Sequence, residues 1–75
     1  MNEPEIIDVR GLKCPLPVLK AARRMKPHAT GTRFLIIATD PMAVIDVPHF
    51  CNENGHRLIA DSRDGDELRF EIEKG

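Results

Sequence analysis

Tryptophan and tyrosine are absent from this 75-residue chain, and phenylalanine occurs only three times. Phe34, Phe50 and Phe70 fall at positions typical of a hydrophobic core, so no exposed aromatic platform for stacking nucleic-acid bases is expected. The longest wholly apolar run, Phe34–Ala38, is far too short to span a bilayer. The first residues carry neither the basic nor the apolar region of a secretory signal. We therefore expect a cytoplasmic protein that contacts no membrane and is unsuited to direct nucleic-acid binding.

Cysteine is also scarce. Cys14 and Cys51 are separated by 36 residues, and the chain has no Cys-x-x-Cys pair, which argues against a disulfide framework, a redox dithiol and a zinc knuckle. His49 and His56 lie near Cys51 in sequence but without any recognised zinc-ligand spacing. We expect two reduced thiols, no bound metal and no cofactor.

Acidic residues are missing from one long stretch. The segment from Val9 to Thr39 contains no aspartate or glutamate but seven basic residues, namely Arg10, Lys13, Lys20, Arg23, Arg24, Lys26 and Arg33. The rest of the chain holds all 12 acidic residues and only four basic ones. This segregation predicts a positive face that attracts an acidic partner. The candidate docking residues on that face are Arg10, Lys20, Arg23 and Arg24.

Hydrophobic periodicity predicts four strands and two helices in the order β-α-β-α-β-β. The strands are expected at Ile6–Val9, Phe34–Ala38, Arg57–Ala60 and Glu67–Glu73, and the helices at Pro15–Lys26 and Met42–Asn54. The apolar stripe of the first helix is expected to contain Val18, Leu19, Ala22 and Met25, and that of the second Val44, Val47 and Cys51. The second strand is apolar without alternation, which favours a strand covered on both faces or nearly so. The fourth alternates, which is typical of a strand with one wet face.

Caps and turns complete the predicted fold. Asp40 before Pro41 predicts the N-cap of the second helix, Gly55 predicts its end, and Asp64-Gly65 predicts a hairpin turn. Pro48 predicts a kink or a restart within that helix, with Asp46 as a second cap. Right-handed crossovers place both helices on the same side of the sheet. The prediction is one domain over residues 1–75, an α+β (α/β) two-layer sandwich with a four-stranded mixed sheet and two helices on one face.

The segment around Cys14 is the strongest candidate for chemistry. Cys14 falls at the start of the first helix, and Pro15 and Pro17 stiffen the chain where helical N–H groups lack partners. The positive end of the helix, together with Lys13 and Arg10, is expected to favour the thiolate. A thiolate attacks sulfane sulfur, disulfides and peroxides. Cysteine serving only as a small apolar residue at a helix start is the simpler alternative, but cysteine is not among the favoured caps.

This segment also carries a family resemblance. The run Asp8-Val9-Arg10-Gly11-Leu12-Lys13-Cys14-Pro15-Leu16-Pro17 closely resembles the opening of the small TusA/SirA/YedF-like sulfur carrier proteins, whose signature is Cys-Pro-x-Pro after a short strand and Gly-Leu. A second block, Asp40-Pro41 through Asp46-Val47-Pro48-His49-Phe50-Cys51, is similar to the corresponding region of the TusA branch. The resemblance covers nearly the whole chain. It makes Gly11, Leu12, Lys13, Pro15 and Pro17 the motif residues that support Cys14.

The resemblance implies that Cys14 carries sulfur as a persulfide. Such a carrier takes sulfane sulfur from a cysteine desulfurase or a rhodanese-like donor and passes it to a cysteine of a downstream acceptor protein. It acts as a sulfurtransferase-type carrier with partner enzymes and is not a self-sufficient enzyme. The family serves tRNA 2-thiouridine synthesis, molybdenum-cofactor synthesis and sulfur oxidation, and the motif does not select among these endpoints.

Two other functions remain open from the sequence. In a thiol-based redox sensor or peroxidase, Cys14 would be oxidised and then resolved by Cys51 or glutathione. In a small RNA-binding module, the basic face would contact phosphates with a strong dependence on salt. Cys51 is expected to pack in the core, and Asp40 and Asp46 are interpreted as helix caps.

Overall fold

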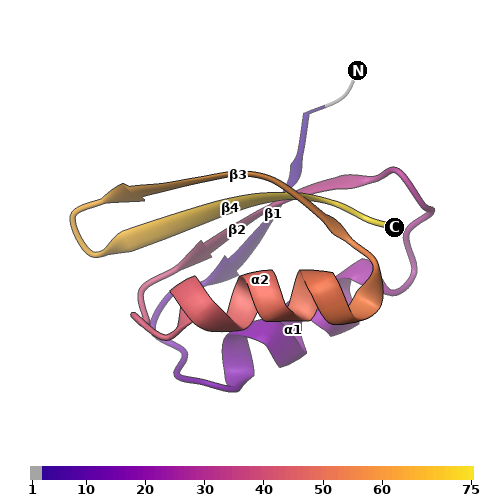
Figure 1. Ribbon diagram of the computed structural model, residues 1–75. Coiled ribbons are helices and arrows are strands. Elements are labelled where there is room, and N and C mark those ends of the chain that lie inside the picture. The colour runs from indigo at the N-terminus through magenta and orange to yellow at the C-terminus, as the bar shows by residue number, and fades with distance from the viewer. Residues whose placement is uncertain (1–2) are drawn as a thin grey trace.

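The predicted order of elements is confirmed in the computed structural model, which describes residues 3–75. The elements are β1 (Glu5–Val9), α1 (Leu16–Met25), β2 (Arg33–Ala38), α2 (Ala43–Asn54), β3 (Arg57–Asp64) and β4 (Glu67–Glu73). The strand order in the sheet is β1-β2-β4-β3, with β1 and β2 parallel and the other two pairs antiparallel. Both helices lie against one face of the sheet, and within residues 3–75 no helix covers the other face (Figure 1). The two-layer α+β prediction is therefore correct.

The core lies between the sheet and the helices. Alternate residues of β1, β2 and β4 face the helices and are buried, among them Ile7, Phe34, Ile36 and Phe70. Strand β2 is buried on the face toward the helices, and Leu35 and Ile37 are half-buried on the open face, in agreement with the expectation that the strand is covered on both faces or nearly so. Neighbouring side chains on that face shield them partly, so the continuous apolar run does not require a second helix layer. The alternation predicted for β4 is confirmed.

The buried stripe of α1 differs from the predicted one. Pro17, Ala21 and Met25 face the sheet at intervals of four residues, and Val18 is half-buried beside them. Leu19 and Ala22, which were expected inside, are exposed. Met25 and Val18 were thus predicted correctly, whereas Pro17 and Ala21 were missed because proline and alanine are weak apolar markers.

Helix α2 begins later than predicted and runs without interruption. Its first turn is tight, because the N–H groups of Ala43 and Val44 donate to carbonyls three residues back, at Asp40 and Pro41. The helix proper therefore starts at Ala43, and Asp40 is not its N-cap. It continues through Pro48 without a restart, so Asp46 is not a second cap. Gly55, with φ of 71°, ends the helix as predicted.

The buried stripe of α2 is also shifted from the predicted one. Ala43, Val47 and Cys51 face the core, whereas Val44 is 52% exposed. As in α1, an alanine on the buried side gives only a weak hydrophobic signal in the sequence. In residues 3–75, no helix has both the length and the apolar character needed to cross a membrane.

Strand β3 is longer than predicted, and it pairs with β4 through the expected turn at Asp64 and Gly65. Its second half, Asp61–Asp64, is exposed and charged, so it lacks the apolar signal of a core strand. This β3–β4 hairpin extends past the helix layer (Figure 1). An irregularity between Leu58 and Ala60 shifts the register within the strand.

Candidate functional site: an exposed thiol between two helix starts

Cys14 lies in the loop that leads from β1 to α1. Pro15 is the N-cap of α1, so Cys14 is the residue just before the cap, and Pro17 occupies the first helical turn. The Cys14–Pro15 peptide bond is cis. The Leu16 N–H donates to the carbonyl of Lys13 at 2.8 Å, which closes a turn around Cys14. The side chain of Cys14 is exposed, so its sulfur is accessible from solvent.

Two side chains that follow β2 hold this loop. The Gly11 N–H donates to Thr39 Oγ1 at 2.9 Å, and the Cys14 N–H donates to Asp40 Oδ2 at 2.7 Å. The other carboxylate oxygen of Asp40 accepts the Met42 N–H at 3.1 Å. Asp40 thus joins the residue that carries the thiol to the start of α2. Parallel pairing of β1 and β2 makes this contact natural, because the two strands end at the same edge of the sheet.

The substitution Asp40→Ala is expected to lower the free energy of unfolding by about 1 kcal/mol, because two backbone N–H groups lose their acceptor. Urea unfolding followed by circular dichroism measures this change. Asp61→Ala, at an exposed aspartate of β3, is the matched control and is expected to lie near the wild-type value. An Asp40→Ala protein as stable as wild type would contradict the anchoring role of Asp40.

The thiol of Cys14 lies in an acidic environment. The Asp46 carboxylate raises the pKa of the thiol by interacting with its protonated form, and partial desolvation and the negative charges of Asp46 and Asp40 raise it further. The prediction of a favoured thiolate is therefore wrong in direction. The positive charge of Lys13 does not offset this rise. The pKa of Asp40 is lowered mainly by the hydrogen bonds from the backbone N–H groups of Cys14 and Met42, and the charge of Lys13 lowers it further.

The predicted docking residues lie in different places. Arg10 pairs with Asp8 at 2.9 Å and with Glu67 at 3.3 Å, and the hydrogen bonds from Arg10 lower the pKa of Asp8 to about 2. Lys20 donates to the backbone carbonyl of Asp8 at 2.8 Å, and Arg24 lies 3.9 Å from Glu5. Arg23 has no ion-pair partner among residues 3–75. Most of the basic residues selected from the sequence are thus engaged with this chain's own β1 or β4.

Cys51 is buried in the core at 3% exposure, and burial raises the pKa of its thiol to about 11. The prediction that it packs in the core is confirmed. His49 pairs with Glu53 at 3.4 Å, and His56 accepts the Gly75 N–H on Nδ1. Within the described part of the chain, no three histidine, cysteine or acidic side chains are grouped as metal ligands.

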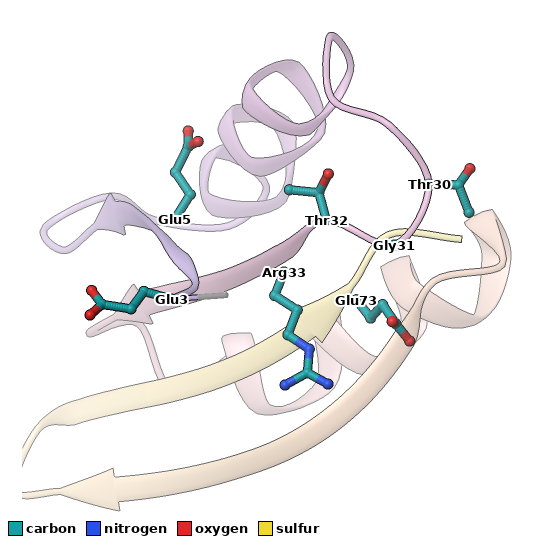
Figure 2. A pocket seen from close by; sticks show the side chains of 7 residues that line it. All are labelled: Glu3, Glu5, Thr30, Gly31, Thr32, Arg33 and Glu73. Carbon is teal, nitrogen blue, oxygen red and sulfur yellow. The ribbon is translucent and has the colours of Figure 1, made fainter. Parts of the chain in front are cut away.

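A surface hollow of about 600 Å³ lies at the other end of the sheet, where β1 and β2 begin and β4 ends. Figure 2 shows that its charged side chains point in different directions and do not converge on one point. Several of them are already paired, as Glu5 is with His28 and Glu73 with Arg57. The hollow is therefore unrelated to the thiol, and its side chains form no evident binding site.

The sequence identified the thiol but not the carboxylate that has the largest effect on its pKa. Asp46 was interpreted as a helix cap, although the structure places it beside Cys14 from a segment 32 residues further along the chain. Only the pairing of two parallel strands, each followed by a helix on the same face, brings these residues together. A signal was present in the second resemblance block, which contains both Asp40 and Asp46.

One comparison with known proteins bears on this geometry. A family model described as sulfurtransferase TusA matches residues 5–74, which is nearly the whole chain. The match includes the Cys14 loop, both aspartates beside it and all six elements. The chain belongs to this family.

Proposed function

From membership of the sulfurtransferase TusA family, whose proteins act with partner proteins in sulfur relays, we propose that this chain carries sulfane sulfur as a persulfide on Cys14. The donor is a cysteine desulfurase or a rhodanese-like protein, and the acceptor is a cysteine of the next relay protein. The observation that carries the proposal is the placement of Cys14, an exposed thiol on a loop that Asp40 fixes at 2.7 Å.

Acceptance of sulfur is an exchange between two sulfur centres. The Cys14 thiolate attacks the terminal sulfur of the donor's persulfide, a new S–S bond forms at Cys14, and the S–S bond of the donor breaks. The donor's thiolate leaves and takes up a proton, while the proton of the Cys14 thiol passes to solvent. Electrons balance within the pair of cysteines, so no external oxidant or reductant is needed. Delivery repeats the step, with the acceptor's thiolate attacking the terminal sulfur on Cys14.

The surroundings of Cys14 suit a carrier better than a self-sufficient enzyme. The thiol is exposed at the surface, so a second protein can bring its own cysteine to it. Asp46 and Asp40 favour the protonated thiol, which is the less reactive form. Because the protonated thiol reacts slowly, an unloaded carrier is protected from adventitious oxidation and remains available to a specific donor.

The two competing functions receive less support. A redox sensor that uses Cys51 as its resolving thiol conflicts with the burial of Cys51 in the core. An RNA-binding module conflicts with the positions of the three phenylalanines, since Phe34 and Phe70 are buried and Phe50 is half-buried. The open sheet face carries ion pairs such as Arg33 with Glu71, so no bare basic surface remains there for phosphates.

We further propose that the carrier works in the cytoplasm and that tRNA 2-thiouridine synthesis is its endpoint. The second resemblance block, which runs from Asp40 to Cys51, is similar to the TusA branch of the family, and this pathway is one of the endpoints that the family serves. A strain that lacks the chain is then expected to lose 2-thiouridine from its tRNA, which mass spectrometry of tRNA nucleosides measures directly.

Intact-mass spectrometry tests the carrier function. Purified protein is incubated with a cysteine desulfurase and cysteine, and the expected result is the addition of one sulfur atom that a thiol reductant removes. Omitting cysteine is the control, because the desulfurase then has no sulfur to give. Absence of any sulfur addition from this donor, from a rhodanese with thiosulfate and from inorganic polysulfide would overturn the proposed function.

A further inference from the structure

Strand β3 forms one edge of the sheet and is open along its outer side. The strand order β1-β2-β4-β3 gives β3 a single neighbour, β4. Residues Ala60–Asp64 of β3 are all exposed, and the hairpin to which they belong extends past the helix layer (Figure 1). The irregularity in the strand lies before them, between Leu58 and Ala60, so their pairing with β4 is regular. An uncovered regular edge presents backbone N–H and C=O groups that can pair with a strand of another chain.

The opposite edge of the sheet, β1, is less suited to such pairing. It is the shorter strand, and the Lys20 ammonium group donates to the backbone carbonyl of Asp8 at 2.8 Å. A side chain of the same molecule thus already satisfies part of the β1 backbone. No corresponding side-chain contact to the backbone of Ala60–Asp64 is present within residues 3–75.

The outer half of β3 carries two opposite charges on one side of the strand. Asp61 is in register with Phe70 of β4, and Arg63 with Leu68. Because Phe70 and Leu68 are buried under the helices, their cross-strand partners lie on the helix side of the sheet as well. Both charged residues line a groove of about 200 Å³, whose apolar residues are Val44, Leu68 and Phe70. Neither Asp61 nor Arg63 has an ion-pair partner among residues 3–75.

We propose that the outer half of β3 is a self-association surface, at which β3 of a second copy of this chain pairs in antiparallel orientation about a two-fold axis at Ser62. In this register Asp61 lies directly opposite Arg63 of the partner subunit, and the symmetry forms the same pair a second time. Directly opposed residues of antiparallel strands have their side chains on the same face, so two interchain ion pairs form. The two four-stranded sheets then make one continuous sheet.

Charge favours this register over its neighbours. Centring the pairing on Asp61 or on Arg63 would place that residue opposite its own copy, and like charges opposed across two strands destabilise the pair. With Ser62 at the centre, an uncharged hydroxyl side chain faces its own copy. Asp64 then faces Ala60 of the partner subunit, which carries no charge. The pattern of charge along β3 is therefore complementary to itself in one register.

The dimer is expected to be weak and to leave the thiol accessible. Only Ala60–Asp64 of each chain pair, far fewer than the roughly 20–30 residues that each side contributes to a stable complex. We expect a dissociation constant on the order of 0.1 mM, so the chain is a monomer at low micromolar concentration. Cys14 follows β1, the strand at the opposite edge of the sheet, so pairing through β3 does not cover it. Self-association is therefore separate from sulfur transfer.

Two charge-reversal variants and their mixture test the proposal by sedimentation equilibrium. As wild-type protein is concentrated from about 10 μM to about 1 mM, its average mass is expected to rise from 8.4 kDa toward twice that value. Asp61→Arg and Arg63→Asp each oppose like charges in the dimer, so each is expected to raise the dissociation constant about tenfold. An equimolar mixture of the two variants is expected to associate as wild type does, because each interchain pair then joins an acidic and a basic residue.

Arg23→Asp is the matched control for Arg63→Asp. Arg23 is also an exposed arginine without an ion-pair partner within residues 3–75, but it lies on α1. The control is expected to keep the wild-type dissociation constant. The double variant with both Asp61→Arg and Arg63→Asp exchanges the two charges within one chain, and it is expected to recover that constant too.

Three results would overturn the self-association proposal. The first is a wild-type mass that stays at one chain up to about 1 mM. The second is association that both single variants retain, or that Arg23→Asp loses to the same extent. The third is a failure to regain association in both the mixture and the double variant. None of these results bears on the carrier function, because that function is judged from the loading of sulfur on Cys14.

Discussion

Cys14→Ser is expected to abolish sulfur loading from every donor while leaving the protein folded. The sulfur atom is the only group at this position that can form the S–S bond, and the serine hydroxyl is not a substitute for it. The fold is unaffected because the side chain is exposed and because the contact to Asp40 is made by the backbone N–H, which serine retains. The measurement is intact mass after donor treatment, together with a thermal melt.

Cys51→Ala is the matched control for this result. Its side chain lies in the core at 3% exposure, so the substitution removes the other thiol without touching the surface. Loading is expected to remain at one sulfur atom per chain, with a loss of stability of about 1 kcal/mol from the smaller side chain. If the Cys14→Ser protein still took up sulfur and the Cys51→Ala protein did not, the carrier thiol would be Cys51. A Cys14→Ser protein that fails to fold would contradict the backbone argument.

Asp46→Asn is expected to lower the pKa of the Cys14 thiol and so to raise its reactivity at neutral pH. The carboxylate now raises that pKa by interacting with the protonated thiol and by its negative charge, and the amide has no charge. While the pH is below the pKa, each unit by which the pKa falls raises the thiolate fraction about tenfold. The rate of alkylation by iodoacetamide at neutral pH therefore increases, and its pH profile moves to lower pH.

The control for this experiment is Asp61→Asn, which removes one negative charge from β3, an element that holds no residue of the thiol site. Alkylation of this variant is expected to follow the wild-type pH profile. Cys51 does not interfere at neutral pH, because burial raises its thiol pKa to about 11. An Asp46→Asn profile that coincides with wild type would show that the acidic environment does not govern the thiol.

The fold could be predicted from this sequence because its elements leave local signals. The alternation in Glu67–Glu73, Gly55 after α2 and the Asp64-Gly65 turn each follow from a few neighbouring residues. The errors in the predicted fold concern which residues are buried. Pro17, Ala21 and Ala43 face the core but give weak burial signals in the sequence.

The candidate site could be predicted only in part, for a related reason. Cys14 and its prolines form a contiguous motif, and the exposed thiol stands where the motif placed it. The pKa of that thiol depends on Asp46 and Asp40, which reach it only through the parallel pairing of β1 with β2. Arg10 is close to Cys14 in sequence, but its ion pairs are with Asp8 and Glu67. Closeness in sequence therefore does not predict which charges act on the thiol.

On the proposed function, the exposed thiol between two helix starts also has a consequence for the order of events in the relay. Of the two thiols in the chain only Cys14 is exposed, so a donor and an acceptor would have to reach the same sulfur atom. We therefore expect donor and acceptor to take turns, with ping-pong kinetics and no ternary complex. An excess of unloaded acceptor is then expected to slow the relay, because it would occupy empty carrier molecules that the donor needs.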